Sequence, residues 1–475
     1  METSPLKNNS TESVSSIEAL DLRWYARFEA LGSFEIEDYL TGDKTYRDSQ
    51  KEAFLKSEIS SPVFDCPKID LDDFTQREEG LLLLKQEILE SEPNELVKQV
   101  YRWKINEKIA SARLLKAAKT GDVRRFERYN NFVFGEPSKE IYDYTVNSLL
   151  QKAQEVLMSE DSSEHLKSAA QDVVDSFTPQ PTVSLYRLPT DETFAMAREA
   201  SLKEVGSLVE LEPFEGKIDA EAMKLVFEET LRKLGVSEEQ NGEWKVVIDS
   251  SSSTAVSLSA ELKAVKIPES RTIEYKKLAG LVAHEVGTHL ARRVNGNRSK
   301  LMLLGLGLDR YIMGEEGVAT MREQVVQKDA LDEFAGLHYH LGISLARGLD
   351  GQKRNFAQTH EMLVKVRYLN KLLEQVKTGE EKPNTALSFA RKNGYNDCAR
   401  IFWGADCSVS GAVFSKDLAY RTGNMNVYRM IETSEGKNEM VRFSIGKYDP
   451  ANPRHIWILD QLGITEEDLD SAEAK

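Results

Sequence analysis

The sequence predicts a mostly helical α+β protein, with a helical N-terminal accessory lobe followed by a mixed domain. Apolar residues make up 40% and charged residues 29% of the 475 residues, a balance typical of globular proteins that bury a core. In the first third of the chain, apolar residues recur at the 3.6-residue spacing of helices. Beyond residue 180, short β-branched runs alternate with helical patterns, which indicates that strands are confined to the second domain.

Four segments are predicted along the chain. A disordered N-terminus covers 1–16, where Ser, Thr and Asn leave little apolar surface to bury. The accessory lobe covers 17–178. The sequence TPQP at 178–181 ends this lobe, because two prolines so close together resist both a helix and a central strand. The second domain covers 182–450, and an acidic C-terminal tail covers 451–475.

Local patterns predict the elements of the second domain. A helix should begin after Asp219, a good N-cap, and end at Gly235. Strands are predicted over 244–248 and 263–267, on either side of a serine-rich run. Further helices are expected over about 272–290, 315–328, 330–347 and 353–377, with a mixed segment near 398–445.

Composition and charge argue against several classes of protein. The net charge of −16 disfavours nucleic acid as a partner, because its binders need a concentrated basic face. No run of 18 apolar residues could span a membrane, and the N-terminus has no apolar stretch behind a basic end, so a cytoplasmic protein is expected. Three cysteines without Cys-x-x-Cys spacing do not form a disulfide framework.

The segment from Leu278 to His289 carries the most informative pattern, His284-Glu285-x-x-x-His289. Two neutral imidazoles that converge on a metal, with a carboxylate base beside them, form the core of a zinc hydrolase. Residues four apart on an ideal helix diverge by about 40°, whereas residues five apart diverge by about 140°. An undistorted helix therefore cannot direct both histidines at the same metal ion. Either a π-bulge or local loosening at Gly287 could return both histidines to one face.

A third ligand should come from a neighbouring helix. The sequence GEEGVAT at 314–320 begins such a helix, and Glu316 would complete a His₂Glu site with its fourth position open. Glu315 is the alternative ligand, or an outer residue that supports one. The alternative interpretation is that both glutamates only stabilise a helix N-terminus.

These motifs resemble those of the microtubule-associated tyrosine carboxypeptidases, whose bacterial relatives have been called flavohaemoglobin expression-modulating QEGLA-motif proteins. The resemblance rests on HEVGTHLARRVNG at 284–296 and EEGVA at 315–319, and extends to GAVFSKDLAY at 411–420 and FGEP at 134–137. It spans roughly 130–445. Glu315 stands where the family usually has Gln, and Trp403 stands where relatives tend to have a second Arg.

The resemblance implies a zincin-like metallopeptidase domain over 182–450 that binds one Zn²⁺ per chain. His284, His289 and Glu316 would be the zinc ligands and Glu285 the catalytic base. A peptide or protein C-terminus would be the substrate, and its carboxylate needs a fixed cation. The candidate substrate-binding residues in the resembling segment are Arg400, Lys416, Tyr420 and Arg421, while Tyr311, His338 or Tyr420 could stabilise the oxyanion.

The function predicted from the sequence is therefore a zinc-dependent carboxypeptidase. One alternative keeps the zinc but acts on a non-peptide amide. Another is a regulatory or binding protein on a peptidase fold, which the intact Glu285 beside a complete ligand set argues against.

Overall fold

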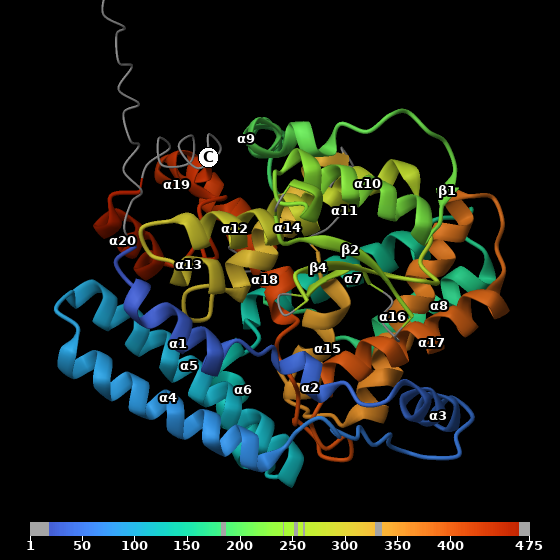
Figure 1. Ribbon diagram of the computed structural model, residues 1–475. Helices are drawn as coiled ribbons and strands as arrows, with labels where there is room; N and C mark the ends of the chain where they lie inside the picture. The colour runs from blue at the N-terminus through green and yellow to red at the C-terminus, as the bar shows by residue number, and fades with distance from the viewer. Residues whose placement is uncertain are drawn as a thin grey trace, which may run out of the picture.

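The computed structural model describes residues 19–181, 187–240, 242–250, 255–259, 262–327 and 335–464. The segment 1–16, predicted to be disordered, and the acidic residues from Thr465 onward lie outside these ranges. Figure 1 shows a mostly helical molecule with a small sheet beside α10 and α11, as the sequence predicts.

The N-terminal part, as far as it is described, is built from helices alone. Polar side chains cap the N-termini of several of these helices. Asp70 accepts hydrogen bonds from the backbone N–H groups of Asp72 and Asp73, and Asn94 accepts them from those of Leu96 and Val97. The two long helices that follow these caps, α4 and α5, run side by side along one edge of the molecule (Figure 1). The helices are α1 Leu22–Gly32, α2 Ile36–Leu40, α3 Lys44–Leu55, α4 Leu71–Ser91, α5 Glu95–Thr120, α6 Val123–Phe134, α7 Lys139–Met158 and α8 Glu164–Ser176.

The strands follow α9 (Asp191–Val209). Both predicted strands are confirmed as β2 (Lys245–Asp249) and β4 (Ala264–Pro268), which pair in parallel with Val246 opposite Val265. Strand β3 (Ser257–Ser259) pairs antiparallel with β4, so the order is β2-β4-β3, and β3 lies at the edge of the sheet as far as the chain is described. A second pair joins β1 (Lys217–Ile218) to β5 (Ile273–Glu274).

The helices after residue 181 follow the predictions in part. The helix predicted over 330–347 is described from Leu337, since residues 328–334 lie outside the described ranges, and α9, α12, α13 and α17 were not predicted. Helix α10 (Ala220–Lys233) has its predicted Asp219 cap. The helix predicted from residue 272 begins only at Leu278, because residues 273–274 pair with β1. The segment near 398–445, predicted to be mixed, contains helices and short turns and no strand among its described residues. Helix α20 (Pro453–Leu462) lies within the segment assigned to the acidic tail. The helices are α11 Leu278–His284, α12 Ala291–Arg298, α13 Leu303–Leu306, α14 Ile312–Gln327, α15 Leu337–Arg347, α16 Phe356–Lys377, α17 Pro383–Ile401, α18 Leu418–Ile431, α19 Ser434–Glu439 and α20, with 3₁₀ turns at Glu238–Gln240, Tyr275–Lys277 and Met440–Arg442.

The hydrophobic cores draw residues from both sides of the predicted boundary at 178–181. One cluster joins Trp24 and Tyr101 to Leu301 and to Leu459 of α20. Others join α7 and α8 to α15–α17, and α5 and α6 to Phe414. Burial of shared apolar surface therefore ties the N-terminal helices to the rest of the chain. None of the described helices is both long and apolar enough to cross a lipid bilayer.

Candidate metal centre

The helix that carries both histidines contains a π-helical turn. Helix α11 continues into a π-helical segment, Glu285–Leu290, and then into α12. The hydroxyl of Thr288 donates to the carbonyl of Ala283, five residues back, and Arg322 Nη1 donates to the carbonyl of Gly287 at 2.7 Å. Of the two distortions considered from the sequence, the structure has the π-bulge. Its wider turn returns residues five apart to one face of the helix.

His284, His289 and Glu316 lie together as the sequence predicts, and these three residues are called the cluster below. Their ligand atoms all lie within 4.8 Å of one another. Glu316 Oε2 is 3.7 Å from Nε2 of His284 and 3.7 Å from Nε2 of His289. This oxygen is buried and has no hydrogen-bond partner among the described residues. Because an unsatisfied buried carboxylate oxygen is costly, its position between two imidazoles is suited to binding a cation.

A second carboxylate lies on the far side of each imidazole. His284 Nδ1 is 2.9 Å from Glu323 Oε2, and His289 Nδ1 is 2.9 Å from Glu315 Oε1. A carboxylate accepts hydrogen bonds, so each Nδ1 carries the hydrogen and each Nε2 keeps its lone pair. This arrangement orients metal-binding histidines in many proteins.

The donor set fits zinc. Two imidazole nitrogens and one carboxylate oxygen, with a fourth position for water, form a common catalytic zinc site. Ligand atoms in a tetrahedral site lie about 3.3 Å apart. The two 3.7 Å separations between Glu316 Oε2 and the histidine Nε2 atoms therefore require only a small contraction. Glu315, the alternative ligand, faces the other side of His289 and contacts Arg292 instead.

The backbone of α14 explains how Glu316 reaches this position. Helix α18 crosses α14 at Gly317 and Gly423, where a Cβ atom on Gly317 would come within 2.5 Å of the Gly423 carbonyl oxygen. Glycine at this point therefore allows a close helix crossing. Lys416, just before α18, and Tyr420, within it, interact electrostatically with Glu316.

Glu285 follows His284 directly and is buried. Burial raises the pKa of Glu285, while the neighbouring His284 and His289 oppose that shift. An elevated carboxyl pKa is common in general bases that accept a proton near neutral pH. Glu315 behaves differently: although burial raises its pKa, Arg292 and Lys447 outweigh this and lower the pKa to about 2.

Three of the four candidate substrate-binding residues differ in the contacts they make. Arg400 donates from Nε and Nη2 to Asp417, at 2.6 and 2.8 Å, and faces the rings of Tyr339, Trp403 and Tyr420. Lys416 Nζ is 2.6 Å from Glu37 of α2, and its charge acts on Glu316. Tyr420 is electrostatically coupled to Glu316 as well.

The other candidates point elsewhere. Arg421 is buried and faces the ring of Tyr144. Tyr311 is influenced by Glu35 and Glu315, and His338 by Arg367 and Arg421, rather than by Glu316.

Three residues near the cluster were not predicted from the sequence to belong to the site. Glu323 lies seven residues after Glu316, hence on the same face of α14, and this spacing could have identified it. Arg292 is fully buried and holds Glu315, but the pair Arg292-Arg293 resembles a solvated stretch in sequence. Glu37 comes from the N-terminal helices, so no local pattern links it to Lys416.

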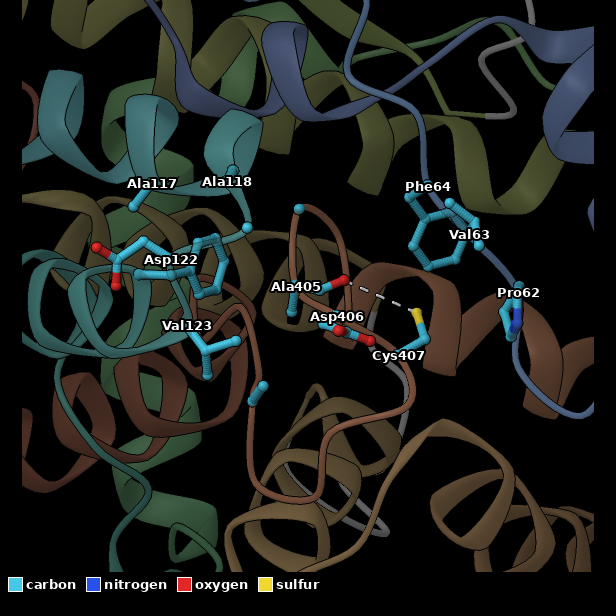
Figure 2. A pocket seen from close by; sticks show the side chains of 14 residues that line it. Pro62, Val63, Phe64, Ala117, Ala118, Asp122, Val123, Ala405, Asp406 and Cys407 are labelled. Atoms are coloured by element: carbon cyan, nitrogen blue, oxygen red, sulfur yellow. Dashed lines mark hydrogen bonds between the residues drawn. The ribbon is translucent and has the colours of Figure 1, made fainter.

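A separate cavity of about 260 Å³ lies between the segment 62–64, the turn joining α5 to α6, and the loop 404–412 (Figure 2). None of the cluster residues lines it. Its carboxylates have local roles: Asp122 caps α6, and Asp406 accepts the Ser408 amide N–H. The cavity is lined by Pro62, Val63, Phe64, Ala117, Ala118, Gly121, Asp122, Val123, Phe126, Gly404, Ala405, Asp406, Cys407 and Ala412.

Comparison with known proteins supports the resemblance seen in the motifs. Residues 179–338 match the family model described as microtubule-associated tyrosine carboxypeptidase. The matched segment contains His284, Glu285, His289 and Glu316. It ends before Arg400, Lys416 and Tyr420 and excludes the N-terminal helices. No curated protein matches the chain.

Proposed function

Because residues 179–338 match a carboxypeptidase family, we propose that this protein is a zinc-dependent carboxypeptidase that removes residues from the C-terminus of a peptide or protein. One observation carries the proposal: the Nε2 atoms of His284 and His289 flank a buried Glu316 oxygen that has no other partner among the described residues. Glu285 adjoins this group. The proposed zinc ligands are His284, His289 and Glu316.

Zinc, when bound, supplies a Lewis acid that polarises the scissile carbonyl and acidifies water. Glu285 is proposed as the general base. Its carboxylate accepts a proton from the water whose oxygen attacks the carbonyl carbon, and it then returns that proton to the nitrogen as the C–N bond breaks. Its burial next to the two histidines suits it to this exchange.

Tyr420 is the best supported of the three candidates for stabilising the oxyanion. It is coupled electrostatically to Glu316, whereas Tyr311 and His338 are coupled to other groups. Its hydroxyl can donate a hydrogen bond to the negative charge that develops on the carbonyl oxygen.

Lys416 is proposed to bind the substrate's terminal carboxylate. Although burial opposes its charge, Glu37, Tyr420 and Glu316 raise the pKa of Lys416, so the ammonium stays charged beside the cluster. Arg400 is the second candidate, but Asp417 already engages it through two hydrogen bonds. Substrate binding at Lys416 would compete with Glu37.

The edge strand β3 is proposed to bind the substrate backbone. Among the described residues it pairs only with β4, and it lies against the π-helical turn. An extended peptide can add to such an edge through main-chain hydrogen bonds.

The test combines metal analysis with peptide digestion. Zinc-loaded wild-type protein should shorten peptides with free C-termini, detected by mass spectrometry, and a chelator should stop the reaction. Glu285→Gln should retain zinc but lose about 10²–10⁴-fold in rate, the contribution of a general base. Wild-type protein that binds no zinc, or cleaves only non-peptide amides, would contradict the proposal.

A further inference from the structure

The two histidines of the cluster have the same kind of partner in unequal surroundings. The side chain of Glu315, which contacts His289, is only 2% exposed. The side chain of Glu323, which contacts His284, is 38% exposed. Water can therefore compete for the Glu323 carboxylate but hardly for that of Glu315.

Glu315 is fixed by buried charges. Arg292 Nη1 donates to Glu315 Oε2 at 2.6 Å, and Lys447 Nζ lies 3.5 Å from Oε1. Arg292 is itself held, because Nε and Nη2 donate to the carbonyls of Gly446 and Tyr448, both at 2.7 Å. Movement of Glu315 would thus disturb both its buried ion pair with Arg292 and the segment 446–448, at a large cost in free energy.

Glu323 has weaker support. Besides His284, its closest hydrogen-bonding contact is with Gln327, whose Nε2 is 3.5 Å from Glu323 Oε1. Lys277 acts on it electrostatically. A rotation of Glu323 into solvent would therefore break few interactions, and it would free the imidazole of His284 to turn.

We propose that Glu315 and Glu323 are positioning residues with different tasks: Glu315 holds His289 fixed, whereas Glu323 holds His284 reversibly, so that the metal enters and leaves on the His284 side. This inference rests on the proposed zinc site. The ligand whose outer hydrogen bond exchanges with water is the one that detaches first. Loss of an outer carboxylate partner typically costs about 10- to 100-fold in metal affinity.

The experiment measures zinc release from the full-length, zinc-loaded protein into an excess of a colorimetric chelator. Glu323→Ala should release zinc about 10- to 100-fold faster than wild type. Glu323→Gln keeps an acceptor for the Nδ1 hydrogen and should restore most of the slow release. Glu274→Gln is the matched control, since that carboxylate is 49% exposed and pairs with Lys276, so its release rate should not change.

The thermal unfolding temperatures of the metal-free variants distinguish Glu323 from Glu315. Glu323→Ala should unfold at the wild-type temperature, whereas Glu315→Ala should unfold at a lower temperature because it leaves the buried Arg292 without its carboxylate. Release from Glu323→Ala at the wild-type rate, or equally fast release from Glu323→Gln, would overturn the inference. A wild-type protein that takes up no zinc would instead remove the proposed function.

Discussion

Two pairs of histidines lie in this protein in opposite electrostatic surroundings. His284 and His289 are each bonded to a carboxylate at Nδ1 and face Glu316 at Nε2. His338 and His340, on α15, have no carboxylate partner among the described residues, and His338 Nδ1 and His340 Nε2 lack any hydrogen-bond partner there. Their charged neighbours are arginines.

The pKa values follow this contrast. Burial opposes protonation of His284, but Glu316 and Glu323 outweigh it and raise its pKa well above the ordinary value. Burial lowers the pKa of His340 to about 3, and Arg421 lowers it further. Acidic side chains therefore favour a positive charge at His284, whereas burial and an arginine keep His340 neutral. What separates the two is the placement of acidic side chains around the ring.

The largest expected effect separates the two pairs by metal content. His284→Ala should abolish stoichiometric zinc binding, a loss greater than the roughly 100-fold typical of removing an outer partner. His340→Ala should leave the zinc content unchanged. Elemental analysis of both purified variants, after dialysis against dilute zinc, checks this. Equal loss of zinc from both would mean that the cluster depends on general packing rather than on its donors.

A smaller effect should distinguish Lys416, whose charge acts on Glu316, from Arg400, which donates two hydrogen bonds to Asp417. Lys416→Met should raise KM for peptides with a free C-terminus by about 10- to 100-fold, since a hydrogen bond to a charged group contributes about 1.5–3 kcal/mol. Arg400→Met should raise it less, because Asp417 already occupies that guanidinium. Steady-state kinetics checks both variants. Amidated peptides serve as the control, since they lack the carboxylate and should not distinguish Lys416→Met from wild type.

The smallest expected effect concerns pH and the buried His340. Its folded-state pKa is about 3, below the unfolded value of about 6.5, so the unfolded chain binds more protons between these limits. Folding stability should therefore fall as the pH decreases below about 6.5, by up to about 1.4 kcal/mol per pH unit from this residue. Urea unfolding of the metal-free protein at pH 7 and 5.5 measures the decrease. His340→Asn should reduce it, and an unchanged pH dependence in that variant would assign the effect to other groups.

Local pattern predicted much of the fold near the site. The β-branched runs became β2 and β4, and Asp219 begins α10 as a capping residue should. The five-residue spacing required a distorted helix, and the structure has a π-helical turn there. These features depend on neighbours within a few residues along the chain.

Features that depend on distant partners were not predictable in this way. The helix expected from residue 272 starts later, because Ile273 pairs with Ile218. Helix α20 packs Ile458 and Leu459 into a core with Trp24, although its surroundings in sequence are acidic. The division of the chain at 178–181 stays a prediction, since the cores on both sides are shared.

The sequence by itself identified the side chains that could bind a metal: two histidines and one glutamate of the pair that follows them. Only the tertiary structure decided that Glu316 lies between the two Nε2 atoms while Glu315 contacts Nδ1 of His289. It also brought Glu323, Arg292 and Glu37 to the site. The physical reason is the distance along the chain over which each interaction acts. Helix period and capping act within a few residues, whereas the orientation of Glu315 and Glu316 is set by the crossing of α14 and α18 at Gly317 and Gly423 and by a buried arginine.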